Sequence, residues 1–97
     1  MGYNYPYEVH SIASSGRDIL HGGSKTLEGA EDILINQIEE LITNPWEEKI
    51  DIARRVNSFY IYNTEDDDVI ETNRTDDFID AILSEFVRKH KLDINKI

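Results

Sequence analysis

Carboxylates are the most abundant reactive side chains of this chain, and nine of the twenty lie in one stretch. Residues 63–85 contain nine Asp and Glu residues against the single base Arg74, which gives this stretch a net charge of −8 out of −10 for the whole chain. Its centre is the run Glu65–Asp68. Carboxylates this close together must stay in water or meet positive charge. Two chemistries follow: coordination of a divalent cation, and pairing with the Lys and Arg side chains of a partner.

A calcium-binding loop is the first of these chemistries, and the spacing argues against it. An EF-hand loop needs oxygen ligands at alternate positions, Gly at the sixth position and a bidentate Glu at the twelfth. If Asn63 is the first position, Asp68 stands in place of the glycine and Arg74 in place of the final Glu. If Asp66 is the first, Ile70 falls at the fifth position. We therefore predict no metal site, and nothing else in the sequence indicates a cofactor.

The histidines and serines do not form a catalytic pattern. Hydrolytic catalysis needs a nucleophile with a base held beside it. Ser14 and Ser15 are near His10 and His21 in the sequence, yet no strained nucleophile turn surrounds them. Residues 22–26, Gly-Gly-Ser-Lys-Thr, lack the glycine spacing of a phosphate-binding loop. We expect no catalytic residues and predict that the protein is not an enzyme.

Pairing with a basic protein is the chemistry that remains. A strongly negative surface repels phosphate backbones and anionic lipid, so we expect no direct binding to nucleic acid or membrane. A nuclease or another nucleic-acid-binding protein would be a suitable basic partner. Tyrosines beside a charged rim are typical of binding hot spots. The predicted partner-binding residues are Glu65, Asp66, Asp67, Asp68, Glu71, Asp76, Asp77, Tyr60 and Tyr62. The alternative for the acidic run is a solvated turn that keeps an exposed edge soluble.

The spacing of apolar side chains predicts that most of the chain is helical. Four helices are predicted, at about residues 6–21, from Ser24 or Thr26 to 43, from Asn44 onward, and from a Thr75 cap to about residue 91. The third helix would place Trp46 on its inward face. We predict a mainly α fold, a small bundle of three or four helices that forms a single acidic domain over residues 1–97.

Residues 58–72 are the ambiguous part of this prediction. Phe59–Tyr62 and Val69–Thr72 are rich in aromatic and β-branched residues, and a polar link joins them. Such a pattern is typical of a short β-hairpin, but a longer third helix would also accommodate the first of the two segments. Both structures stay open at this point.

The chain contains no cysteine, so it has neither a disulfide framework nor a thiolate metal site. No apolar stretch approaches the ~18 residues of a membrane span. These features are compatible with a cytoplasmic protein, and we predict that location.

The segment Tyr60-Ile61-Tyr62, followed by Glu65–Asp68 and a final helix, resembles the colicin nuclease immunity proteins, which are small, acidic and four-helical. The resemblance implies a negative surface that caps a basic nuclease. The family's Asp before the tyrosines is replaced by Ser58 or Phe59 here, and Ile61 separates the two tyrosines. We treat the likeness as one of design and do not infer membership.

These observations together favour a non-catalytic inhibitor or antagonist that binds and occludes a basic surface of a partner protein. Immunity proteins, antitoxins and phage-encoded inhibitors of host defence belong to this class. In a stricter version the carboxylates imitate the phosphates of a nucleic acid. The alternatives are a structural or assembly subunit of a virion or complex, whose acidity serves solubility, and a regulatory adaptor with one tight partner.

Overall fold

Residues 5–97 are described by a computed structural model, and they form an antiparallel sheet with three α-helices. The strands are β1 (Tyr7–Ile12), β2 (Asp18–Ser24), β3 (Tyr60–Asn63) and β4 (Asp68–Ile70). The helices are α1 (Leu27–Ile42), α2 (Lys49–Val56) and α3 (Asn73–His90), followed by a short 3₁₀ turn at Ile94–Lys96. None of the helices in this part of the chain is long and apolar enough to cross a membrane.

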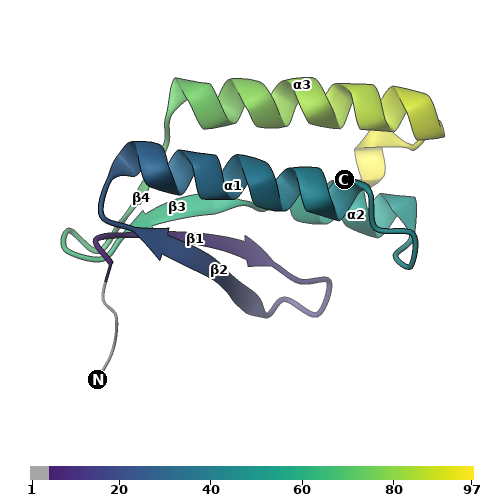
Figure 1. Ribbon diagram of the computed structural model, residues 1–97. Helices are drawn as coiled ribbons and strands as arrows, with labels where there is room; N and C mark the ends of the chain where they lie inside the picture. Colours follow the sequence, from purple (N-terminus) through teal and green to yellow (C-terminus); the bar gives the residue numbers. More distant parts are fainter. Residues whose placement is uncertain (1–4) are drawn as a thin grey trace.

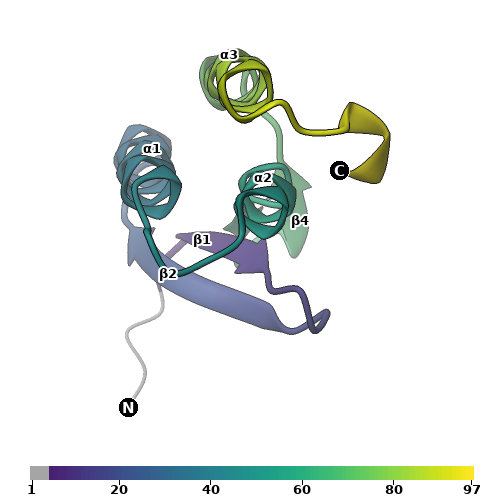
Figure 2. The same cartoon turned by 90° about the vertical axis from the view of Figure 1, so that its right-hand side faces the viewer.

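The elements are stacked in three layers. The sheet has the strand order β2-β1-β3-β4, and every neighbouring pair is antiparallel. Helices α1 and α2 lie on one face of the sheet, and α3 lies on the far side of these two helices and packs against them (Figures 1 and 2). No helix of residues 5–97 covers the other face of the sheet, which we call the open face.

The core lies between the sheet and the helices, and the strands supply it with alternate side chains, as expected for a sheet with one covered face. Val9 and Ser11 of β1 and Ile61 of β3 are buried on the covered face. The rest of the core is apolar and comes mostly from the helices: Ala30, Leu34, Ile38, Leu41, Ile52, Ala53, Val56, Phe59, Ile79 and Phe86.

The predicted mainly helical bundle is wrong, because the N-terminal segment is a β-hairpin and the fold is α/β. Helical spacing was present, but so was an alternation with period two that brings Val9 and Ser11 to the covered face. Ser11 is polar and therefore hid this alternation. Between the strands Gly16 adopts a φ of 86°, a left-handed conformation that favours glycine and closes the turn.

A β-bulge in β2 determines which side chains reach each face. The register between β1 and β2 shifts after Val9: Val9 pairs with Gly22, whereas His10 pairs with Leu20. His21 is therefore the extra residue of the bulge. As a result, Leu20 lies on the open face with His10, and His21 is turned inward against Ser11, 2.7 Å from its hydroxyl.

The ambiguous segment is a β-hairpin, formed by β3 and β4, and the two longest helices lie close to their predicted positions. Thr26 caps α1 and accepts a hydrogen bond from the Gly29 amide at 3.0 Å. The cap of α3 is Thr72 and not Thr75: its hydroxyl accepts from the Thr75 amide at 3.2 Å, and Thr75 is buried within the first turn. Both caps satisfy an amide that the helix leaves free.

Helix α2 begins at Lys49, later than predicted, and Trp46 is not on its inward face. The Asn44 side chain accepts a hydrogen bond from the Trp46 amide at 2.8 Å and so closes a tight turn before the helix. This local bond competes with helix capping, a general property of asparagine. Trp46 is consequently left 90% exposed.

Candidate functional site

Seven of the nine predicted partner-binding residues come to the same end of the molecule. The turn between β3 and β4 projects at this end, and α3 begins above it (Figure 1). We define the acidic end as Glu65–Asp68, Glu71, Asp76 and Asp77, all of which are exposed. The charge pattern that identified these residues in the sequence is therefore also a surface in space.

Asn63 organises the acidic turn. Its side-chain oxygen accepts hydrogen bonds from the amides of Glu65 and Asp66, at 3.0 and 3.2 Å, and its Nδ2 donates to a carboxylate oxygen of Asp66 at 3.2 Å. Asp67 has a φ of 50°, a left-handed conformation that Asp and Asn tolerate better than most residues. The carboxylates of the run are thus presented on a fixed backbone.

The N-terminal segment fastens this turn to the rest of the sheet. The Thr64 amide donates to the carbonyl of Pro6 at 2.9 Å, and the Thr64 hydroxyl donates to the carbonyl of Tyr5 at 2.9 Å. These bonds extend the pairing of β1 with β3 beyond the ladder itself. The acidic turn is therefore not a loosely attached loop.

Arg74, the one base among residues 63–85, forms ion pairs with two carboxylates of α1. Its guanidinium lies 3.3 Å from Glu31 and 2.6 Å from Asp32, and the hydrogen bond to Asp32 is the main cause that raises the pKa of Arg74. Because both partners are on α1, Arg74 ties α3 to α1 and does not neutralise the acidic end. Within residues 5–97 none of the seven carboxylates of the acidic end forms an ion pair.

Positive charge collects at the opposite end of α3. The last turn of this helix and the residues after it contain Arg88, Lys89, Lys91 and Lys96. Eighteen residues of helix, at about 1.5 Å each, separate the two ends by roughly 27 Å. Helix α3 is therefore acidic at its start and basic at its end, and a basic partner is directed to the acidic end.

The other two predicted residues, Tyr60 and Tyr62, lie on the open face of the sheet and are not part of the acidic end. The ring of His10 stacks on Tyr60, with centroids 5.1 Å apart, and meets Tyr62 edge-on. Tyr60 also donates its hydroxyl to Asp18 at 2.8 Å. Both tyrosines are half-buried by these contacts. The nine residues thus belong to two surfaces that meet near the β3–β4 turn.

Charges on the open face are arranged around His10. Its Nε2 is 3.0 Å from Glu8 and its Nδ1 is 3.0 Å from Asp18. The ring stands between the two carboxylates, so the three side chains do not converge on one point. Across residues 5–97 no group of three or more His, Cys, Asp or Glu side chains is placed to hold a metal ion.

A serine, a histidine and a glutamine form a chain of hydrogen bonds on the covered face, which the sequence analysis did not identify. Ser11 Oγ is 2.7 Å from His21 Nε2, and His21 Nδ1 is 3.1 Å from the side-chain oxygen of Gln37. Nδ1 therefore donates to Gln37, and the Ser11 hydroxyl donates to Nε2. Burial lowers the pKa of His21 and favours this neutral form.

This chain resembles a nucleophile with its base, but Ser11 is 0% exposed and no substrate can reach its oxygen. A neutral glutamine also does not stabilise an imidazolium as a carboxylate does. We conclude that the three residues satisfy buried polar groups of the β1–β2 hairpin and α1.

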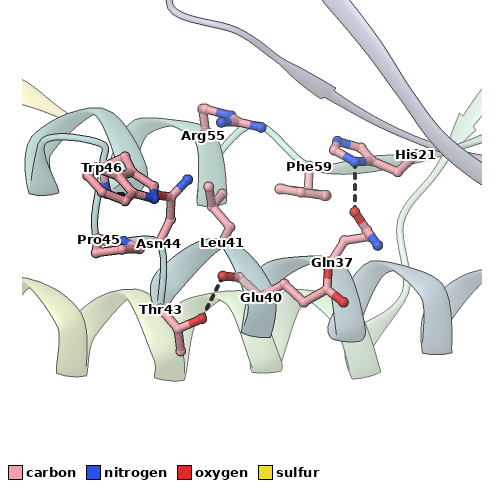
Figure 3. Close-up of a pocket in the computed structure, with 10 residues that line it drawn as sticks. All are labelled: His21, Gln37, Glu40, Leu41, Thr43, Asn44, Pro45, Trp46, Arg55 and Phe59. Carbon is pink, nitrogen blue, oxygen red and sulfur yellow. Dashed lines mark hydrogen bonds between the residues drawn. The ribbon is translucent and has the colours of Figure 1, made fainter.

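The end of α1 and the turn after it enclose a hollow of about 420 Å³ (Figure 3). His21, Gln37 and Phe59 stand at one side of it, and Trp46 stands at the other beside Asn44 and Pro45. Arg55 lies over the hollow and pairs with Glu47 at 2.6 Å. Trp46 is the largest exposed apolar side chain at this end of the molecule, and the sequence analysis missed it because its helical spacing indicated burial.

No protein-family model matches the chain, no curated protein matches it, and no solved structure matches its fold. The resemblance to colicin nuclease immunity proteins gains no support from these comparisons, and the sheet is foreign to a four-helix protein.

Proposed function

We propose that this chain is a non-catalytic binding protein that occludes a basic surface of a partner protein, in the manner of an inhibitor or antagonist. The observation that carries the proposal is the acidic end: seven exposed carboxylates on an ordered turn and a helix start, with Arg74, the one base among residues 63–85, paired to α1. A cytoplasmic location is part of the proposal and is supported by the absence of cysteine.

The mechanism would be electrostatic steering followed by occlusion. In the free protein the carboxylates repel one another, and a cationic partner relieves this repulsion when it docks. Complementary charge of this kind raises association rates and selects the partner more than it raises affinity. The Asn63 bonds hold the turn in place beforehand, so little ordering is needed on binding.

Nucleic-acid mimicry is the stricter form of this proposal. A nuclease or a DNA-binding protein carries a groove of Arg and Lys side chains that binds phosphates, and exposed carboxylates on a rigid backbone can occupy the same places. The two tyrosines beside the turn would add apolar contact at the rim of such a groove.

An assembly role is the second candidate, and one specific observation favours it. Leu20 and Val69 are 58% and 49% exposed on the open face, on the two edge strands of the sheet. A sheet face with exposed apolar side chains is often covered by another subunit. This role predicts a constitutive oligomer that is disrupted by Leu20→Glu and is indifferent to changes at the acidic end.

The proposal is tested by affinity capture from the lysate of the native host or of its natural target, at low and high salt. Asp66, Asp67 and Asp68 are replaced together by Asn, which removes three charges and suits the left-handed turn. The matched control replaces Glu39, Glu40 and Glu85, which are exposed on α1 and α3, by Gln.

A basic protein that is retained by the wild type and the control, is released by salt and is lost with the Asn variant would support the proposal. Equal capture by all three proteins would refute the assignment of the acidic end. Equal loss with both variants would show attraction to net charge alone.

A further inference from the structure

The fold leaves the side chain of Trp46 exposed to solvent. It stands in the turn between α1 and α2, is 90% exposed, and has its amide fixed by Asn44 at 2.8 Å. Leaving an indole in water forgoes the free energy that burial of so large an apolar side chain would release. Exposed tryptophans on ordered backbone are the residue type most enriched in binding hot spots. The position therefore indicates a contact surface.

A second hollow, of about 520 Å³, shares Trp46 and Arg55 with the first. Its lining includes three carboxylates, those of Glu47, Glu48 and Asp51, together with Arg55. Arg55 is neutralised by Glu47, so the hollow keeps an excess of negative charge. The indole thus borders an acidic hollow.

All three of these carboxylates have unused capacity as hydrogen-bond acceptors. Glu47 gives one oxygen to Arg55, and its other oxygen, Oε2, is enclosed without a hydrogen bond from any residue between 5 and 97. Glu48 forms no ion pair within the same part of the chain, and Asp51 has only a long contact of 3.7 Å with Arg54. A group that donates several N–H bonds is the natural complement of such a hollow.

We propose that Trp46 and the carboxylates of Glu48 and Asp51 bind an arginine side chain of a protein partner. A guanidinium is planar and weakly hydrated, stacks on an indole through cation–π attraction, and presents a fork of N–H donors to carboxylates. A lysine ammonium fits this site less well because it is strongly hydrated and does not stack. Phosphate groups and other anions are excluded by the charge of the hollow.

The arginine site is separate from the acidic end. Helix α1 begins at the acidic end and leads to the Trp46 turn (Figure 1), and its sixteen residues span about 24 Å. One small ligand cannot contact both places. The inference therefore does not rest on the proposed function, and either can fail without the other.

The test uses the fluorescence of Trp46, which is the only tryptophan of the chain. A tetra-arginine peptide is titrated into the protein, with tetra-citrulline as the neutral isostere and tetra-lysine as the second cation. The result expected is a saturable change in Trp46 emission with tetra-arginine, none with tetra-citrulline, and half-saturation at about fivefold higher concentration with tetra-lysine.

Two variants locate the binding. Glu48→Gln with Asp51→Asn should raise the half-saturating tetra-arginine concentration about fivefold to tenfold. The matched control, Asp66→Asn with Asp67→Asn, removes the same charge at the acidic end and should leave it within about twofold. All four side chains are at the surface, so the fold, checked by circular dichroism, should be retained.

The proposal is overturned if the emission of Trp46 does not respond to tetra-arginine, or if the two double variants weaken the response equally. Equal half-saturation for tetra-lysine and tetra-arginine would also overturn it, since it would show general cation attraction and no recognition of the guanidinium plane.

Discussion

Two leucines test the three-layer architecture, because the structure places them in opposite environments. Leu34 on α1 is 1% exposed within the core, and Leu20 on β2 is 58% exposed on the open face. Truncation of Leu34 to Ala removes three buried carbons, worth about 2.4 kcal/mol at about 0.8 kcal/mol each. The cavity left behind adds to this, so Leu34→Ala should lower the free energy of unfolding by roughly 3–5 kcal/mol. Leu20→Ala should lower it by less than about 0.5 kcal/mol.

Urea unfolding followed by circular dichroism measures both changes. With an m-value of about 1–1.5 kcal/mol per molar urea for a domain of this size, Leu34→Ala should move the midpoint down by roughly 2–5 M. Leu20→Ala should barely move it. If residues 6–21 instead formed a helix with Leu20 on its apolar face, truncation of Leu20 would cost about as much as that of Leu34. A large loss at Leu20, or a loss below about 1 kcal/mol at Leu34, would refute the layers described here.

Three further predictions concern titrating and paired groups. Burial and the hydrogen bond to Asp18 raise the pKa of Tyr60 to about 12, so the neutral ring stabilises the fold below about pH 10 and this contribution is lost between about 10 and 12. One tyrosine should accordingly ionise late in an ultraviolet titration, and Asp18→Asn should move it part of the way back; no late tyrosine would contradict this. Burial lowers the pKa of His21, so the imidazole is protonated at a lower pH in the folded protein than in the unfolded chain. Stability is therefore lost as the pH falls below about 6.5. His21→Asn should flatten the dependence of the urea midpoint on pH in that range, and an unchanged slope would argue against the neutral histidine. Arg74→Ala breaks two half-exposed ion pairs and should leave the urea midpoint almost unchanged; a clear drop in the midpoint would contradict the weak contribution expected of ion pairs at the surface.

The helices were predictable because their signals are local. In α1 the Thr26 cap and the spacing of Ala30, Leu34, Ile38 and Leu41 give both the start and the buried face. The end of α3 was equally clear from its basic last turn, and its start was displaced by only one turn. Thr72 and Thr75 both have the residue type of a cap, and they bond to each other through their hydroxyls at 2.8 Å.

The N-terminal hairpin was not predictable from apolar spacing, because its inward positions are partly polar. Ser11 and His21 face the helices and satisfy each other, so an alternation test that counts apolar residues fails on this segment. The bulge at His21 further interrupts the period of β2. The signal that was available was punctuation: Ser14-Ser15-Gly16 is an unsuitable helix interior and a good turn.

The candidate site also has a part that could be predicted from the sequence and a part that could not. The acidic end could be predicted because a run of charge is exposed whichever element carries it. The division between this end and the open face could not, since it depends on whether residue 60 lies on a strand or a helix. Trp46 was missed because the Asn44 side chain closes a turn where a helix cap was expected.

Measurement of association rates tests the proposal that the acidic end is a docking surface for a basic protein. The protein recovered by affinity capture is mixed with the wild type, with the Asn variant of residues 66–68, and with the Gln control at Glu39, Glu40 and Glu85, over a range of salt concentrations. We predict that the Asn variant associates about tenfold more slowly at low salt, with a shallower salt dependence, and that the control stays within about twofold of the wild type. Equal rates for the Asn variant and the control would contradict the claim.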